Sequence, residues 1–132
     1  AKTGTLYSIR IEPETQVILE RYKGVEHLLS VFDGGVKYDF YYRNLNRGLR
    51  KFGPVIDGRG KMQPIEPNLT SYWARHSWAT YASELDIPKD TISECLGHQY
   101  GSRITATYIH FSQKKIYEAN RKVLDYVFKG VK

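Results

Sequence analysis

The sequence predicts a mostly α-helical domain whose β structure is confined to its beginning. After residue 38, apolar side chains recur at steps of three, four and seven residues, which is typical of amphipathic helices. Alternation with a period of two occurs only in the first residues. With 132 residues, 41% of them hydrophobic and 26% charged, the chain is expected to form one domain with its own core.

The chain is expected to begin with a strand that leads into a helix. Residues 5–11 (TLYSIRI) have apolar side chains at every second position, which predicts the strand. Pro13 suits the first turn of a helix and Gly24 suits its end. Between them, Val17 and Ile18 belong to a stripe with helical spacing.

Residues 38–52 form the clearest amphipathic helix of the sequence. Its apolar residues share one side of the helix: Tyr38, Tyr41, Tyr42, Leu45, Leu49 and Phe52. Arg43, Arg47 and Arg50 share the opposite side. These arginines form either a solvated polar face or, in a basic domain, a stripe that follows DNA phosphates.

A loop and two helices are expected next. Residues 53–67 contain three glycines and three prolines, which predicts a loop. Thr70 is a suitable N-cap for a helix over 71–85. A short helix over 89–96 follows, and Gly97 suits its left-handed C-cap.

The remaining elements complete the helical prediction. Residues 98–103 are expected to form a loop, and 104–110 a short helix that carries Tyr108. Ser112 is a suitable N-cap for a last helix. Its apolar side chains share one side: Ile116, Val123, Leu124, Val127 and Phe128.

The composition favours a polyanionic partner. The net charge is +6 and the isoelectric point is near 9.4, which fits DNA, RNA or anionic lipid equally well. No apolar run approaches the roughly 20 residues of a membrane span, and no signal peptide is recognisable. Cys95 is the only cysteine, so an internal disulfide is excluded and a reducing compartment such as the cytoplasm is expected.

Three residues point to phosphoryl-transfer chemistry. The guanidinium of Arg75 is a planar fork that can bind two phosphate oxygens, and His98 can donate to a third. Tyr108 follows His98 by ten positions and can attack the same phosphate. Composition alone favours a structural tyrosine, because the chain has eleven. The acidic residues are scattered, and no metal site is predicted.

These residues stand in motifs that resemble the tyrosine recombinases, the phage-integrase family. The motifs are Arg-His-Ser at Arg75, Leu-Gly-His ending at His98, and Thr-x-x-Tyr ending at Tyr108, and the resemblance extends back to Lys2-Thr3-Gly4. It implies the fold of that catalytic domain with a small N-terminal β-hairpin remnant. It also implies that Tyr108 forms a 3′-phosphotyrosyl bond with DNA, and that Lys2 protonates the leaving 5′-oxygen.

The chain departs from the family pattern at two places. The family has His or Lys three residues before the arginine, where this chain has Tyr72; this tyrosine would either bind phosphate or pack. A second catalytic arginine would precede Lys2, so residues 1–132 are expected to be the C-terminal part of a catalytic domain, without the upstream part and the core-binding domain. Alone, this part is expected to be inactive or crippled. Arg103 is a further candidate for DNA contact.

The resemblance predicts site-specific DNA recombination, including integration, for a bacterial mobile element. The expected partners are double-stranded DNA and further copies of the full-length protein in a homotetramer on DNA. Neither metal nor another cofactor is expected, and the location would be the bacterial cytoplasm at the nucleoid. Two rival functions remain: an enzyme like the type IB topoisomerases, and a basic DNA-binding module without catalytic activity.

Overall fold

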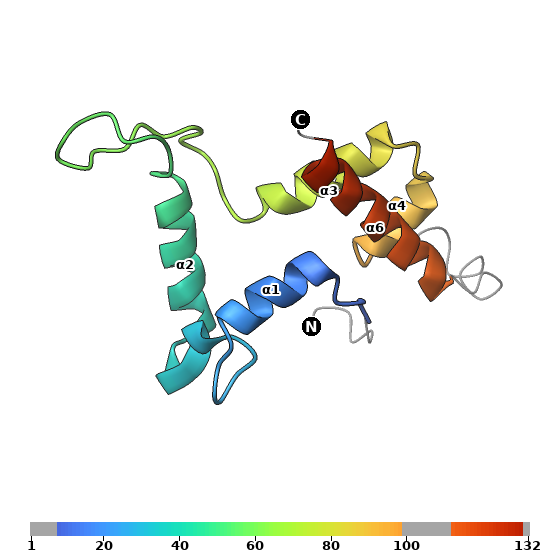
Figure 1. Cartoon of the computed structure of the whole chain (residues 1–132), viewed down its shortest axis with the longest axis horizontal. Coiled ribbons are helices and arrows are strands. Elements are labelled where there is room, and N and C mark those ends of the chain that lie inside the picture. Colours follow the sequence, from blue (N-terminus) through green and yellow to red (C-terminus); the bar gives the residue numbers. More distant parts are fainter. Residues whose placement is uncertain (1–7, 99–111, 131–132) are drawn as a thin grey trace. The chain divides into compact units, whose positions relative to one another are not determined.

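The computed structural model describes residues 8–98 and 112–130, and these residues are mostly helical (Figure 1). Their helices are α1 (Pro13–Arg21), the 3-10 segment η1 (Ser30–Gly35), α2 (Tyr38–Leu49), α3 (Trp73–Glu84), α4 (Lys89–Cys95) and α6 (Gln113–Lys129). Each of the five α-helices was expected, with ends that coincide or differ by up to three residues. The predicted loop over 98–103 and the short helix over 104–110 lie almost entirely outside the described residues.

The predicted N-terminal strand and β-hairpin are not seen among the described residues, which contain no strand. Residues 8–12 lie along α6 instead. The side-chain amide of Gln113 donates to the carbonyl oxygen of Ser8 at 2.5 Å, and the guanidinium of Arg10 lies 5.3 Å from the centre of the Tyr117 ring. Polar and apolar residues do alternate in this segment. The polar residues face α6, however, and the apolar Ile9 is 59% exposed.

The described residues form two compact units. Unit 1 comprises residues 8–12, 75–98 and 112–130, and unit 2 comprises residues 13–74.

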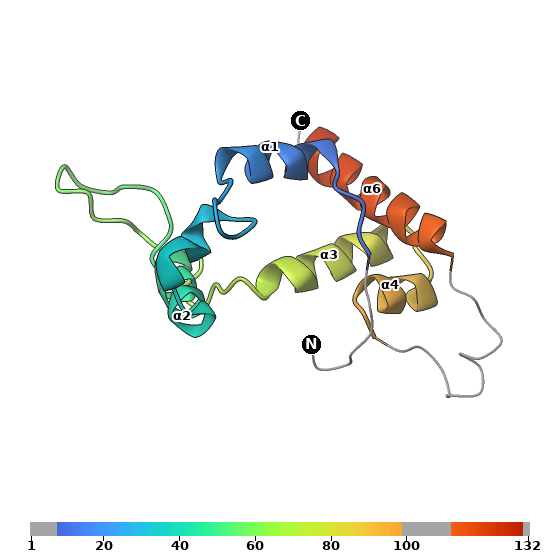
Figure 2. The ribbon, with the colours of Figure 1, turned by 90° about the horizontal axis from the view of Figure 1, so that it is seen from below.

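Unit 1 contains a hydrophobic core between α3, α4 and α6 (Figure 2). The buried side chains of this core are Ala82, Ile87, Ala119 and Val123, and partly buried residues surround them: Trp78, Tyr81, Leu85, Ile92, Cys95 and Val127. The indole nitrogen of Trp78 donates to Asn120 Oδ1 at 3.2 Å, which ties α3 to α6. The apolar sides predicted for α3 and α6 thus supply most of this core, but Phe128, on the predicted side of α6, is 61% exposed, and Ile87 comes from the segment between α3 and α4.

Unit 2 has a different interior. The helices α1 and α2 expose most of their apolar side chains: Val17 of α1 is 65% exposed and Tyr38 of α2 is 63% exposed. The buried residue of α2 is polar, and it is Asn46, whose Oδ1 accepts a hydrogen bond from the backbone nitrogen of Ser71 at 2.7 Å. The apolar side of α2 predicted from the sequence is thus formed but is not buried within unit 2.

Two irregular segments of unit 2 are held by hydrogen bonds. Between α1 and α2, the carboxylate of Asp33 accepts backbone hydrogen bonds from Val25, Glu26 and His27 at 2.7, 3.2 and 3.0 Å. The predicted loop over 53–67 contains no helix, as expected. It does fold back on itself, because Ile56 donates its backbone hydrogen bond to Lys61 at 2.9 Å.

Candidate functional site

Arg75 and His98, predicted to share a site, lie together in unit 1. Arg75 is the third residue of α3, and His98 follows the C-terminal turn of α4. The Nη2 atom of Arg75 lies 2.9 Å from Nε2 of His98 and also donates to the carbonyl oxygen of Leu96 at 2.5 Å. Residues 23 positions apart in sequence are thereby in direct contact.

The position of His98 follows from the way α4 ends. Gly97 has φ +69°, the left-handed conformation that the sequence predicts for a C-cap glycine. The backbone nitrogen of Gly97 donates to Glu94, and that of His98 donates to Ser93, both at 2.9 Å. This pair of bonds is the Schellman motif, which reverses the chain and places the exposed imidazole beside Arg75.

The contact sets the roles of the two groups. A guanidinium donates hydrogen bonds and never accepts them, so Nε2 of His98 is the acceptor in this contact. To donate to a phosphate from the same nitrogen, the ring would have to carry a proton there.

The carbonyl oxygen of Leu96 is the part of this arrangement that the sequence analysis missed. It is a main-chain acceptor, and no side-chain pattern identifies it. Its bond to Nη2 fixes one corner of the guanidinium.

The roles of the other predicted catalytic residues stay predictions. Tyr72 lies one residue before α3 and is 52% exposed. Lys2, Arg103 and the proposed nucleophile Tyr108 lie outside the described residues, and their roles remain predictions.

The predicted DNA-binding arginines of α2 are exposed. Nε of Arg43 donates to the carbonyl oxygen of Asp39 at 3.2 Å, and Nη2 of Arg47 donates to Asn44 Oδ1 at 2.7 Å. With Phe40, these side chains line a hollow of about 290 Å³, and Arg50 lies outside it. The hollow is in unit 2, so it is a separate candidate site.

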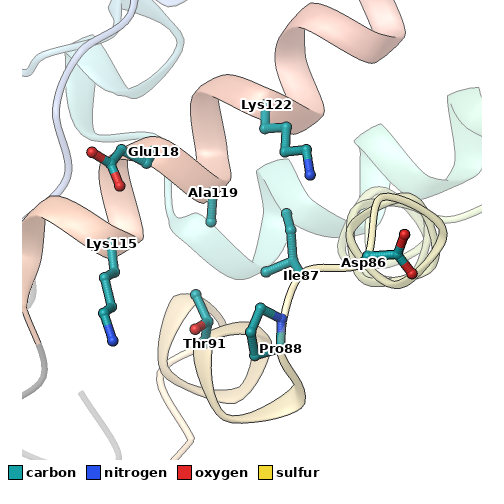
Figure 3. Close-up of a pocket in the computed structure, with 8 residues that line it drawn as sticks. All are labelled: Asp86, Ile87, Pro88, Thr91, Lys115, Glu118, Ala119 and Lys122. Atoms are coloured by element: carbon teal, nitrogen blue, oxygen red, sulfur yellow. The ribbon is translucent and has the colours of Figure 1, made fainter.

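Two further clusters bring charged side chains together. A hollow of about 300 Å³ lies between α4 and α6 (Figure 3), where Lys115 and Lys122 stand with the carboxylates of Asp86 and Glu118 around an apolar floor. The mixture of charges favours no ligand of one sign. In unit 2, the carboxylates of Glu26 and Asp33 lie near His27, as the ligands of a metal ion would. Both oxygens of the Asp33 carboxylate already accept hydrogen bonds from backbone nitrogens.

No helix among residues 8–98 and 112–130 is long and apolar enough to cross a membrane. Comparisons with protein-family models, with curated proteins and with solved structures found no match to this chain.

Proposed function

We propose that this chain is the C-terminal part of a tyrosine recombinase catalytic domain, which breaks and rejoins double-stranded DNA through a 3′-phosphotyrosyl bond. The observation that carries the proposal is the contact between Arg75 and His98, at 2.9 Å and from separate helical segments. Their motifs resemble those of the family, and the basic composition of the chain suits the same substrate.

The first task of the site is to bind a phosphodiester. Arg75 would donate to the non-bridging oxygens, and His98 would donate to one of them from Nε2. Charge builds on these oxygens when the phosphorus becomes pentacoordinate, and donors held in place stabilise that charge without reorganising. The bond from Arg75 to Leu96 supplies such a fixed position.

The second task is to exchange one phosphate ester for another. The phenolic oxygen of Tyr108 would attack phosphorus, forming the phosphotyrosyl bond while the bond from phosphorus to the 5′-oxygen breaks. The phenol loses its proton to solvent, the departing 5′-oxygen gains one from Lys2 by resemblance to the family, and Lys2 regains a proton from solvent, so the number of protons is unchanged. The energy of the broken ester is kept in the new one, so rejoining by the reverse step needs no ATP and no metal.

The proposal includes the setting of the reaction. The full-length protein would act as a homotetramer on two duplexes, in the cytoplasm of a bacterium that carries the mobile element. An upstream arginine would complete the site, and Tyr72 would contact the phosphate where family members have His or Lys. Arg103 would bind the DNA backbone near the cleaved phosphate.

The test uses a protein that carries this chain together with the upstream arginine. It is mixed with a nicked duplex from which the cleaved strand end diffuses away, so that a covalent adduct accumulates and is seen on a denaturing gel. Tyr108→Phe should abolish the adduct, because only the phenolic oxygen is removed. Tyr117→Phe, the matched control, should leave the adduct unchanged.

A second variant tests the arginine. Arg75→Lys keeps the charge but loses the fork, so adduct formation should fall by about two to three orders of magnitude while DNA binding is largely kept. DNA binding by the unaltered protein without any adduct would favour the non-catalytic DNA-binding module. Relaxation of supercoiled DNA irrespective of sequence would favour a topoisomerase. An adduct formed by Tyr108→Phe would remove Tyr108 from the mechanism.

A further inference from the structure

Phe40 is an aromatic residue on the polar side of α2. It stands with Arg43, Asn44 and Arg47 at positions i, i+3, i+4 and i+7, which share one face of a helix. Its side chain is 59% exposed and packs into no core, although these four residues line a hollow of about 290 Å³. A solvated polar face does not require an aromatic ring at this place.

The guanidinium of Arg43 is held in one orientation. Its Nε donates to the carbonyl oxygen of Asp39, one turn earlier in α2. This bond uses the inner nitrogen and leaves the two terminal nitrogens as a planar pair of donors. A fork that is already oriented loses less conformational freedom when it binds a second time.

The amide of Asn44 is oriented in the same way. Its Oδ1 accepts from Nη2 of Arg47 at 2.7 Å, so the acceptor of the amide is occupied and its two N–H donors remain. The polar groups that Arg43, Asn44 and Arg47 can offer to a ligand are therefore all donors. They stand beside one exposed aromatic ring.

We infer that this face of α2 determines DNA sequence specificity: Arg43 reads a guanine, and Phe40 contacts the methyl group of a neighbouring thymine. Guanine presents two acceptors, N7 and O6, in the major groove, and a bidentate arginine matches both. The thymine methyl is the apolar group of that groove, and the groove admits an α-helix. Asn44 donates to a further acceptor of the same strand.

The inference rests on the proposed DNA substrate and adds base reading to it. Contacts to phosphate alone would require charge but neither the aromatic ring nor the oriented amide. Arg50 provides the comparison, because it is exposed at the C-cap of α2 but lies outside the hollow. Arg50 is expected to contact phosphate without reading sequence.

The experiment selects bound duplexes from a pool with a random central segment, using the protein that carries this chain. The unaltered protein should enrich a sequence with a fixed guanine next to a thymine. Arg43→Lys should weaken the preference for the guanine, with a roughly ten- to hundredfold loss of discrimination at that position. Phe40→Leu should weaken the preference for the thymine. Arg50→Ala should weaken binding to every duplex and leave the enriched sequence unchanged.

A second measurement leaves the protein unaltered and changes the DNA. Replacing the fixed guanine by 7-deazaguanine removes one acceptor and should weaken binding roughly tenfold. Replacing the thymine by deoxyuridine removes one methyl group and should weaken binding about fourfold. Circular dichroism of the variants should match that of the unaltered protein, since the substituted side chains are exposed.

The outcomes separate this inference from the proposed function. Suppose that the protein binds DNA, that the variants enrich the same sequence as the unaltered protein, and that the modified duplexes bind as tightly as the unmodified duplex. In that case α2 reads no bases, and only the inference fails. Enrichment of no sequence, with binding retained, overturns the inference in the same way. If the protein does not bind the pool at all, the proposed function fails with it.

Discussion

Unit 1 buries four apolar side chains together, whereas the residue that unit 2 buries, among its residues 13–74, is an asparagine. Both units contain amphipathic helices of similar length. In unit 1, α3, α4 and α6 present their apolar sides to one another, and Val123 is 2% exposed at their centre. In unit 2, α2 is held at Asn46 by a bond to the backbone of Ser71.

The difference shows what an apolar stripe establishes. Spacing at three and four residues determines that a helix forms with an apolar side, but burial requires a second element with a matching side. Unit 1 supplies that element in α6. In unit 2, the neighbouring segments are a nine-residue helix and loops that are ordered by polar contacts around Asp33.

The largest expected effect comes from placing a charge in each apolar side. Val123→Asp would bury an unpaired carboxylate in the core of unit 1, and should lower the free energy of unfolding by more than about 4 kcal/mol. Leu45→Asp on α2 changes a residue that is 36% exposed, and should cost less than about 1 kcal/mol. Denaturant unfolding followed by circular dichroism measures both. A Leu45→Asp cost as large as that of Val123→Asp would abolish the contrast between the units.

A second prediction concerns the buried carboxylate of unit 1. Glu12 is 4% exposed and binds Arg10 at 2.7 Å and Arg121 at 3.1 Å, which fastens residues 8–12 to α6. Glu12→Ala should lower the free energy of unfolding by about 2–3 kcal/mol. The loss is smaller than for a buried arginine left without any partner, because Arg121 keeps its bond to Asp125. Glu20→Ala, on the exposed surface of α1, is the matched control and should change stability by less than about 0.5 kcal/mol. Equal effects of the two substitutions would show that the ion pairs do not hold the N-terminal segment.

The same contrast explains which parts of the fold could be predicted from the sequence. Helix α2 was predicted from its periodicity, and the end of α4 from Gly97, because both depend on local backbone preferences. The strand over 5–11 was predicted by the same local reasoning and is not seen in residues 8–11, the part of it that the structure describes. Its polar residue Arg10 finds a partner on α6, a contact between residues more than a hundred positions apart that no local pattern contains.

The candidate site was predictable to the same extent. The chemistry of their side chains and their motifs identified Arg75 and His98, and the two lie in contact. The carbonyl oxygen of Leu96, which fixes the guanidinium, could not be identified, because every residue has such an oxygen. Phe40 was not singled out either, although an aromatic residue among arginines on a polar helix face is a signal that the sequence contains.

Acid should affect unit 2 through Asp33. The backbone hydrogen bond from Val25, followed by those from His27 and Glu26, lowers the pKa of Asp33 below its ordinary value of 3.8. A pKa lowered by folding contributes stability that is complete above pH 3.8 and is lost as the pH falls through the folded value. The amide resonances of Val25 and His27 should therefore shift below pH 3.8, before those of the core residue Val123 change.

Asp33→Asn is the control for this titration. It keeps one acceptor oxygen but cannot ionise, so the same amide resonances should no longer respond to pH in that range. If they still shift, another group controls the segment between α1 and α2. If the Val123 resonance changes together with them, the two units respond to acid as one.

The smallest expected effect is a change of reaction rate at Cys95, which reports on unit 1 alone. Burial, and to a lesser extent the charge of Glu94, raises the pKa of the thiol from 9.0 to about 11. At mildly alkaline pH, the fraction of Cys95 present as thiolate is therefore about a hundredfold lower than for a cysteine with a pKa of 9.0. The more basic thiolate is more nucleophilic by nearly tenfold, so alkylation should be about tenfold slower than for an unfolded cysteine. Partial burial of the side chain against the core should slow it further.

In the Val123→Asp variant, Cys95 should react at the unfolded rate, whereas in Leu45→Asp it should stay slow. Fast alkylation in the unaltered protein would mean that α4 opens readily, and that the core of unit 1 does not confer the stability assigned to it.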